Sequence, residues 1–158
     1  MPITARKSHL AARPAAAPSP DEDSLGYLAR YAHRAFAKAL ARELEPHGVL
    51  SAQWSVLRVL WTNDGLSQVD LAERMQVEKA SLTGVLDGME RKGLIRRKRN
   101  PDDRRKIVIT RTAAANKLKD GILPYGAAIN ARATRGMSAP EIDQLKRALI
   151  KVIGNLAQ

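Results

Sequence analysis

The alternation of apolar and polar positions along the chain predicts a mainly α-helical protein. After residue 24, apolar side chains recur every three or four positions, the spacing that places them on one face of a helix. The first such stretch, LGYLARYAHRAFAKALAREL, follows three acids and a Ser that can cap a helix, so we expect a helix within residues 21–46. Pro46 and Gly48 are expected to end it, because neither residue continues a helix readily.

Three shorter helical patterns follow, and the second and third predict a helix-turn-helix. Ser51 is expected to cap the first, AQWSVLRVLW. In the second, SQVDLAERM, Ser67 and Asp70 have the spacing of a capping box. The third, EKASLTGVLDGMERKG, is expected to begin near Glu78 and to end at Gly93, where a left-handed residue would close the helix.

A β-hairpin is predicted immediately after these helices. Segments 94–99 and 106–110 can pair, with Ile107 and Ile109 on one face, and the NPDD sequence between them consists of turn-forming residues. A hairpin that follows a helix-turn-helix is the order of elements in a winged helix, here over residues 50–110. In that fold the second helix of the pair enters the major groove of DNA, and the hairpin, or wing, lies over the DNA backbone.

The charge distribution favours contact with nucleic acid. The chain has 27 Lys and Arg against 16 Asp and Glu, a net charge of +11, and +8 of this lies between Arg91 and Arg111. So dense a cluster of cations attracts a polyanion. A solvated basic surface is the alternative, but the position of the cations on the predicted wing favours DNA. Binding to a membrane surface is not expected, because the cations do not lie along one face of an amphipathic helix.

The residues that catalysis and metal binding require are scarce. There is no Cys, the histidines His9, His33 and His47 show no ligand spacing, and there is no Gly-rich phosphate loop. We therefore expect no enzyme activity, no metal site and no cofactor. No run of about eighteen apolar residues predicts a membrane span. The lack of Cys fits a reducing compartment, so the cytoplasm is the expected location.

Residues 1–20 differ from the rest of the chain in composition. They contain four of the eight prolines and six alanines but no acidic residue, which predicts a disordered basic tail. Arg13, Pro14 and Pro18 interrupt the continuous apolar core that a secretory signal needs, so we do not expect an export signal.

Further helices are predicted after Thr112. Gly121 and Pro124 are expected to kink the first helical segment. Ser138 and Glu141 form a second capping-box pattern ahead of the last helix. That helix carries a long apolar stripe: Ile142, Leu145, Leu149, Val152, Ile153 and Leu156.

The helices that flank the predicted core need a surface to cover. We expect the winged-helix core to be complete without residues 21–46 and 112–158, so a second subunit is the expected partner for these dimerisation helices. Packing of the last helix against the first within one chain is the alternative. The expected fold is therefore mainly α, with a winged helix-turn-helix core, a small β-hairpin wing, and flanking N- and C-terminal dimerisation helices.

Three segments carry a family resemblance: LSQVDLAERM, SLTGVLDGMERKGLIRR and NPDDRRKIVIT. They closely resemble the multiple antibiotic resistance regulator (MarR) family, whose wing bears an acid–Arg–Arg motif before a strand that ends in Thr. The resemblance covers roughly residues 24–158. It implies a sequence-specific transcriptional regulator that binds a palindromic operator in double-stranded DNA as a homodimer. Ligand-responsive repression is the commoner mode in this family and activation is the other, and the sequence does not distinguish them. A non-specific architectural DNA-binding protein is the alternative.

The candidate DNA-binding residues have different expected roles. The resemblance places Arg105, with Arg104 beside it, at the wing tip, where they would reach into or along the minor groove. Asp103 is expected to orient these arginines, because phosphates would repel an unpaired acid. The other candidates lie off the buried stripe of the recognition helix (Lys79, Ser81 and Thr83) or on the hairpin (Arg96, Arg97, Lys98, Arg99 and Lys106).

Two glycines in the recognition helix call for an explanation, because each costs on the order of 1 kcal/mol relative to Ala. Gly84 and Gly88 are expected to face outward. A smooth helix surface that lies close to the groove floor is one hypothesis, and neutral drift on an exposed face is the other.

The resemblance also implies an effector pocket between the dimer helices and the DNA-binding core. The expected effector is small and anionic or aromatic, such as an aromatic acid or its coenzyme A thioester, which cationic side chains could bind. An ordinary solvated helix surface is the alternative for these positions. The candidate pocket residues are Tyr27, Arg30, Tyr31, Arg34 and Trp54.

Overall fold

The structure is a computed structural model that describes residues 24–157, and the chain divides between Arg34 and Ala35 into two units. The described part of the first unit is the beginning of helix α1 (Leu25–Leu44). The second unit contains the rest of α1 and every later element. The tail predicted for residues 1–20 lies outside the described residues.

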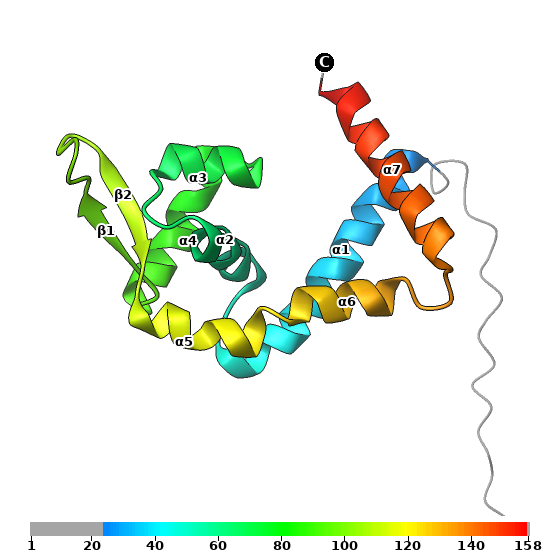
Figure 1. Ribbon diagram of the computed structural model, residues 1–158, viewed down its shortest axis with the longest axis horizontal. Coiled ribbons are helices and arrows are strands. Elements are labelled where there is room, and N and C mark those ends of the chain that lie inside the picture. The colour runs from blue at the N-terminus through cyan, green and yellow to red at the C-terminus, as the bar shows by residue number, and fades with distance from the viewer. Residues whose placement is uncertain (1–23, 158) are drawn as a thin grey trace, which may run out of the picture. The chain divides into compact units, whose positions relative to one another are not determined.

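The order of elements confirms a mainly helical protein with one hairpin. Figure 1 shows the two strands, in green and yellow-green, beside the helices α3 and α4. After α1 the elements are η1 (Glu45–His47), α2 (Ser51–Thr62), α3 (Gln68–Met75), α4 (Lys79–Arg91), β1 (Ile95–Arg99), β2 (Ile107–Arg111), α5 (Ala113–Ile122), α6 (Tyr125–Ala133) and α7 (Ala139–Leu156).

Local hydrogen bonds explain where several helices begin. The Ser67 hydroxyl accepts from the backbone N–H of Asp70 at 3.1 Å, and the Asp70 carboxylate accepts from the backbone N–H of Ser67 at 3.3 Å. Ser138 and Glu141 make the reciprocal arrangement at the start of α7, so both predicted capping boxes are confirmed. The hydroxyls of Ser67 and Ser138, and then their backbone N–H groups, donate to the carboxylates of Asp70 and Glu141 and hold the pKa values of these acids below their ordinary values.

The predicted cap of α2 is wrong by one residue. Ser51 is the first helical residue, and Leu50 is the cap. The side-chain oxygen of Gln53 accepts from the backbone N–H of Leu50 at 3.2 Å, so this helix start uses the amide of Gln53 and not a serine hydroxyl at the cap position.

The hydrophobic core extends beyond the predicted winged-helix segment. Leu44, from the end of α1, and Ile122, from the end of α5, are fully buried in the same cluster as α2, α3 and α4. The indole N–H of Trp54 donates to the backbone oxygen of Ile122 at 3.0 Å, and that of Trp61 donates to the backbone oxygen of Ala115 at 3.2 Å. The core is therefore not complete within residues 50–110, because it includes Leu44 and Ile122 and because both tryptophans of α2 are hydrogen-bonded to α5.

The hairpin pairs in the predicted way, with Ile95 opposite Arg111 and Arg99 opposite Ile107. Its base joins the core, because the backbone N–H of Ile109 donates to the oxygen of Leu66 at 2.7 Å. Ile109 is buried, whereas Ile107 is 55% exposed. Residues two apart in a strand share a face, but Ile107 lies nearer the wing tip, beyond the edge of the core.

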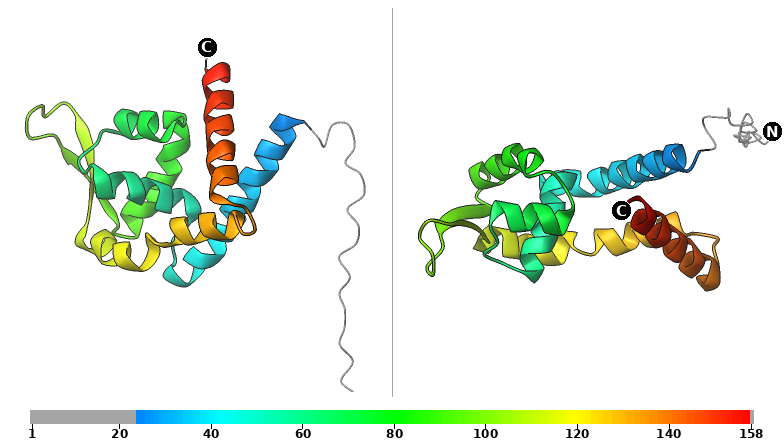
Figure 2. Two further views of the ribbon diagram at one scale, coloured as in Figure 1. Left: turned by 45° about the vertical axis from the view of Figure 1, so that its right-hand side comes forward. Right: turned by 90° about the horizontal axis from the view of Figure 1, so that it is seen from above.

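The C-terminal helices show a break and an unburied face. The kink predicted at Gly121 and Pro124 is a complete interruption, since α5 ends at Ile122 and α6 begins at Tyr125. Helix α7, shown in orange to red in Figure 2, has no buried side chain within one chain. Several residues of its predicted apolar stripe are among the exposed large hydrophobics: Leu145, Leu149, Ile153 and Leu156.

None of the helices within residues 24–157 is both long and apolar enough to cross a membrane.

Candidate nucleic-acid interface

The recognition helix α4 buries one face and exposes its candidate DNA contacts. Leu82, Leu86 and Met89 are buried in the core. Lys79, Ser81 and Thr83 are exposed, as expected. The helix is therefore held by its apolar stripe and presents polar groups on its remaining surface.

Both hydroxyls on α4 already make hydrogen bonds. The Ser81 hydroxyl donates to the backbone oxygen of Glu78 at 2.7 Å. The amide nitrogen of Gln68, the first residue of α3, lies 3.1 Å from the Thr83 hydroxyl and 3.0 Å from the backbone oxygen of Lys79. Gln68 was not among the candidate residues that the sequence pattern indicated. The only available signal was a polar residue at the start of the first helix of a helix-turn-helix.

The turn between α3 and α4 contains a residue in an unusual conformation. Gln76 has φ 53° and ψ 46°, in the left-handed region. The backbone N–H of Val77 then donates to the oxygen of Ala72 at 3.0 Å, which closes the C-terminal end of α3.

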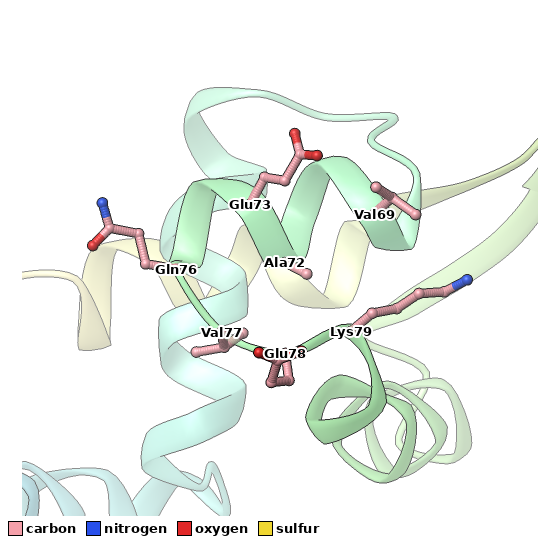
Figure 3. Close-up of a pocket in the computed structure, with 7 residues that line it drawn as sticks. All are labelled: Val69, Ala72, Glu73, Gln76, Val77, Glu78 and Lys79. Carbon is pink, nitrogen blue, oxygen red and sulfur yellow. The ribbon is translucent and has the colours of Figure 1, made fainter. Parts of the chain in front are cut away.

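A hollow of about 420 Å³ lies beside this turn. Figure 3 shows Val69 and Ala72 of α3 above Val77 of the turn and Lys79, the first residue of α4. Carboxylates on both sides of the turn, from Glu73 and Glu78, also line the hollow. An anionic effector would be repelled here, so this hollow is a poor candidate for the expected effector site.

The two glycines of α4 lie in different surroundings. A Cβ atom on Gly84 would meet no atom within 4 Å, so this glycine does face open space. Gly88 is half-buried, and a Cβ there would lie 3.3 Å from the amide nitrogen of Gln53. The prediction that Gly88 faces outward is therefore wrong, because the N-terminal end of α2 packs against that side of α4.

At the wing tip, Asp103 contacts Arg105. The Asp103 carboxylate accepts from the backbone N–H of Arg105 at 3.1 Å and from its guanidinium Nε at 3.3 Å. The Arg105 side chain is nevertheless 94% exposed. Arg99 donates to the backbone oxygen of Arg104 at 2.8 Å across the loop. The tip thus holds two arginines on a loop that is closed by its own hydrogen bonds.

The sequence suggested that Arg97 contacts DNA, but its guanidinium is paired within the protein. Its guanidinium donates to Asp87 at 2.7 Å and to Glu90, both on α4, and its side chain is only 26% exposed. The backbone N–H of Arg97, and then its guanidinium, hold the pKa of Glu90 below its ordinary value. Arg97 therefore joins the wing to the recognition helix. The other hairpin candidates are exposed: Arg96, Lys98, Arg99, Arg104 and Lys106.

Four of the five effector candidates lie together on the first turns of α1. The rings of Tyr27 and Tyr31 stack with their centroids 4.2 Å apart. The guanidinium groups of Arg30 and Arg34 lie over these rings, each 5.8 Å from a ring centroid. Cations and aromatic faces at such distances attract each other.

Trp54, the fifth effector candidate, belongs to the second unit and is buried in its core. Besides the bond to Ile122, its ring lies 4.9 Å from the guanidinium carbon of Arg58. The structure thus gives Trp54 a packing role. In the part of the chain that the structure describes, no three His, Cys, Asp or Glu side chains come together as a metal site would require.

Comparison with known proteins finds helix-turn-helix transcriptional regulators. The model of the MarR family matches residues 51–107. The uncharacterized HTH-type transcriptional regulator YkoM of Bacillus subtilis is 31% identical over 120 residues, which are 72% of this chain and 78% of that protein. The name of this relative places it among the helix-turn-helix transcriptional regulators.

Two solved structures show the same fold. The MepR–DNA complex of Staphylococcus aureus has a TM-score of 0.77 and 25% identity, over 87% of this chain and 99% of that one. CouR from Rhodococcus jostii, bound to p-coumaroyl-CoA, has a TM-score of 0.72 and 25% identity, over 83% of this chain and 92% of that one. Proteins of this fold thus include one bound to DNA and one bound to an aromatic thioester.

Proposed function

This chain belongs to the MarR family of winged helix-turn-helix transcriptional regulators, and we propose that it represses transcription by binding a palindromic operator as a homodimer. The observation that carries the homodimer is the exposed apolar stripe of α7, which nothing within residues 24–157 buries. A second copy would remove this stripe from water. A two-fold axis would then present two α4 helices to half-sites about one helical turn apart.

The DNA contacts that we propose come from α4, from the wing tip and from the rest of the hairpin. Lys79, Ser81 and Thr83 would meet base edges or phosphates in the major groove, and Arg104 and Arg105 would reach the minor groove. The exposed hairpin cations would contact phosphates and supply affinity without sequence preference: Arg96, Lys98, Arg99 and Lys106. Arg97 and Asp103 would act indirectly, through the side chains and helix that they hold.

We also propose that a small anionic or aromatic effector releases the protein from DNA. The first turns of α1 offer the ring faces of two tyrosines and the cations of two arginines, which suit an aromatic acid or its coenzyme A thioester: Tyr27, Tyr31, Arg30 and Arg34. The bound p-coumaroyl-CoA of CouR is a ligand of this chemical class. Trp54 is left out of the proposed site because its indole is buried and hydrogen-bonded.

The effector proposal has a direct test. Replacing Arg30 and Arg34 together by Gln should weaken the release of DNA by a candidate aromatic thioester, while effector-free binding to the operator stays the same. Equal losses of both activities would reject this site. Lys146→Gln and Lys151→Gln together remove the same two positive charges from α7 and should change neither.

The protein would act in the cytoplasm, associated with the nucleoid through its DNA. Residues 21–158 would form one regulator domain, and the basic composition of residues 1–20 would add non-specific attraction to DNA.

The experiment that tests the function compares two duplexes. The first is the DNA immediately upstream of the protein's own gene, and the second is a shuffled duplex of equal composition, both at about 150 mM salt. A specific regulator should prefer its operator by about 10³-fold or more. Equal binding to both duplexes with a steep salt dependence, followed by a genome-wide footprint without discrete sites, would instead support the architectural alternative.

A further inference from the structure

The side-chain amide of Gln68 has a defined orientation. Its nitrogen lies 3.0 Å from the backbone oxygen of Lys79 and 3.1 Å from the hydroxyl of Thr83. A backbone oxygen can only accept a hydrogen bond, so it requires the NH₂ end of the amide, not its oxygen, to face α4. The amide nitrogen has two hydrogens, and one goes to each partner. The Thr83 hydroxyl oxygen is therefore an acceptor from Gln68.

This bond leaves the hydrogen of the Thr83 hydroxyl to be donated elsewhere. Thr62 and Thr134 donate theirs to the backbone oxygen four residues earlier, at 3.3 and 3.0 Å. Between residues 24 and 157, Thr83 has no such acceptor, and its side chain is exposed. Its hydrogen is thus directed to whatever molecule lies against this side of α4.

Ser81 provides the contrast on the same helix. Its hydroxyl hydrogen is donated to the backbone oxygen of Glu78 at 2.7 Å. Ser81 therefore presents lone pairs to a ligand, and Thr83 presents a hydrogen. Phosphate oxygens accept only, so a phosphate suits Thr83 and does not suit Ser81.

We propose that Gln68 is a positioning residue that makes Thr83 a hydrogen-bond donor to a base edge. Thr83 would then contact an acceptor atom in the major groove, namely N7 or O6 of guanine, N7 of adenine or O4 of thymine, and would reject the amino group of cytosine. The inference rests on the proposed function, because it requires α4 to enter the major groove of a specific operator.

The first test selects bound sequences from a randomised operator library. With Thr83→Val, which keeps the shape of the side chain but lacks the hydroxyl, the base preference should disappear at two symmetry-related positions of the operator. Thr83→Ser keeps a hydroxyl and should retain that preference. In direct binding, the wild type should lose about fivefold in affinity when an analogue deletes the contacted acceptor atom, and Thr83→Val should lose nothing.

The second test addresses Gln68 itself. Gln68→Glu has nearly the same shape, but a carboxylate cannot donate, so the Thr83 hydroxyl would turn and donate to it. Gln68→Ala removes the donor without adding a charge. Both variants should lose the preference at the same two positions while melting temperature and the preferences elsewhere are retained. A role confined to folding would lower the melting temperature and leave base preference unchanged.

Three results would each overturn the inference while the proposed function stands. The Thr83→Val variant could keep the full base preference, or cytosine could be favoured at the contacted position. Finally, both Gln68 variants could select the same bases as the wild type. A wild-type protein that binds operator and shuffled DNA equally would overturn the proposed function, and this inference with it. The two failures are distinguishable because the second is visible before any variant is made.

Discussion

At the scale of single residues, Gln76 has a backbone conformation that side chains disfavour. A residue with a Cβ atom in the left-handed region is less stable there by about 1 kcal/mol or more than Gly, and the Gln76 side chain is exposed. We expect Gln76→Gly to raise the free energy of unfolding by about 1 kcal/mol, measured by denaturant titration. Gln76→Ala retains the Cβ atom and should change it little. A stabilisation by Ala as large as that by Gly would show that the backbone is not the cause.

Removal of the Asp103 carboxylate should change operator affinity in opposite directions if its effect is charge alone or if it orients Arg105. If its only effect were charge, its removal from a DNA-binding wing should strengthen binding. Because it holds Arg105 by two hydrogen bonds, and Ala removes the acceptor as well as the charge, we expect Asp103→Ala to weaken operator binding, by about fivefold in a fluorescence-anisotropy titration. Asp102→Ala removes the neighbouring acid and should strengthen binding slightly. Tighter binding by the Asp103 variant would contradict the orienting role.

At the scale of elements, the attachment of the wing to α4 depends on Arg97. Its charge lies against Asp87 and Glu90, so we expect it to displace no counterion from DNA. Arg97→Ala should leave the slope of log affinity against log salt unchanged and should speed hydrogen exchange in the wing. Arg96→Ala, on the adjacent exposed residue, should reduce the slope by about 1. Equal slope changes in both variants would mean that Arg97 contacts phosphate.

The same attachment should depend on pH. The pKa of Glu90 in the folded protein lies below its ordinary value of 4.5, so its contribution to stability is present above pH 4.5 and is lost as pH falls through the folded pKa. We expect hydrogen exchange in the wing to accelerate in that acidic range. Glu90→Gln can still accept from the backbone of Arg97 but does not titrate, so the Glu90 part of this acid dependence should be absent. An unchanged pH profile in this variant would assign the effect to other carboxylates.

At the scale of the whole molecule, α7 should control assembly. Replacing Leu149 and Ile153 together by Glu places charges on its exposed apolar stripe, so we expect monomers in sedimentation velocity and a loss of operator affinity of at least about 10²-fold. Lys151→Glu places one of these charges on the polar side of α7 and should preserve the dimer. A dimer that survives both Glu substitutions would show that another surface joins the subunits.

The sequence predicted those features whose causes lie within a few residues. The Ser67–Asp70 box and the left-handed Gly93 depend on neighbours along the chain, and both are present. Contacts between elements were not predictable in the same way. The pairing of Gln68 with Thr83 and the attachment of Arg97 to α4 depend on how the helices and the wing pack, which spacing along the chain does not specify. The charge of Arg97 indicated DNA, although its nearest partners are carboxylates.

Trp54 and Trp61 are the only tryptophans in the chain, and each donates its indole N–H to the backbone of α5. Their fluorescence is therefore an intrinsic optical signal of whether α2 and α5 remain in contact. An effector that separates the two helices should shift the emission to longer wavelengths as the buried indoles meet water. An effector that rotates α2 and α5 together should release DNA with no shift in the emission wavelength. The unlabelled protein can thus distinguish local separation from rigid-body movement in a simple titration.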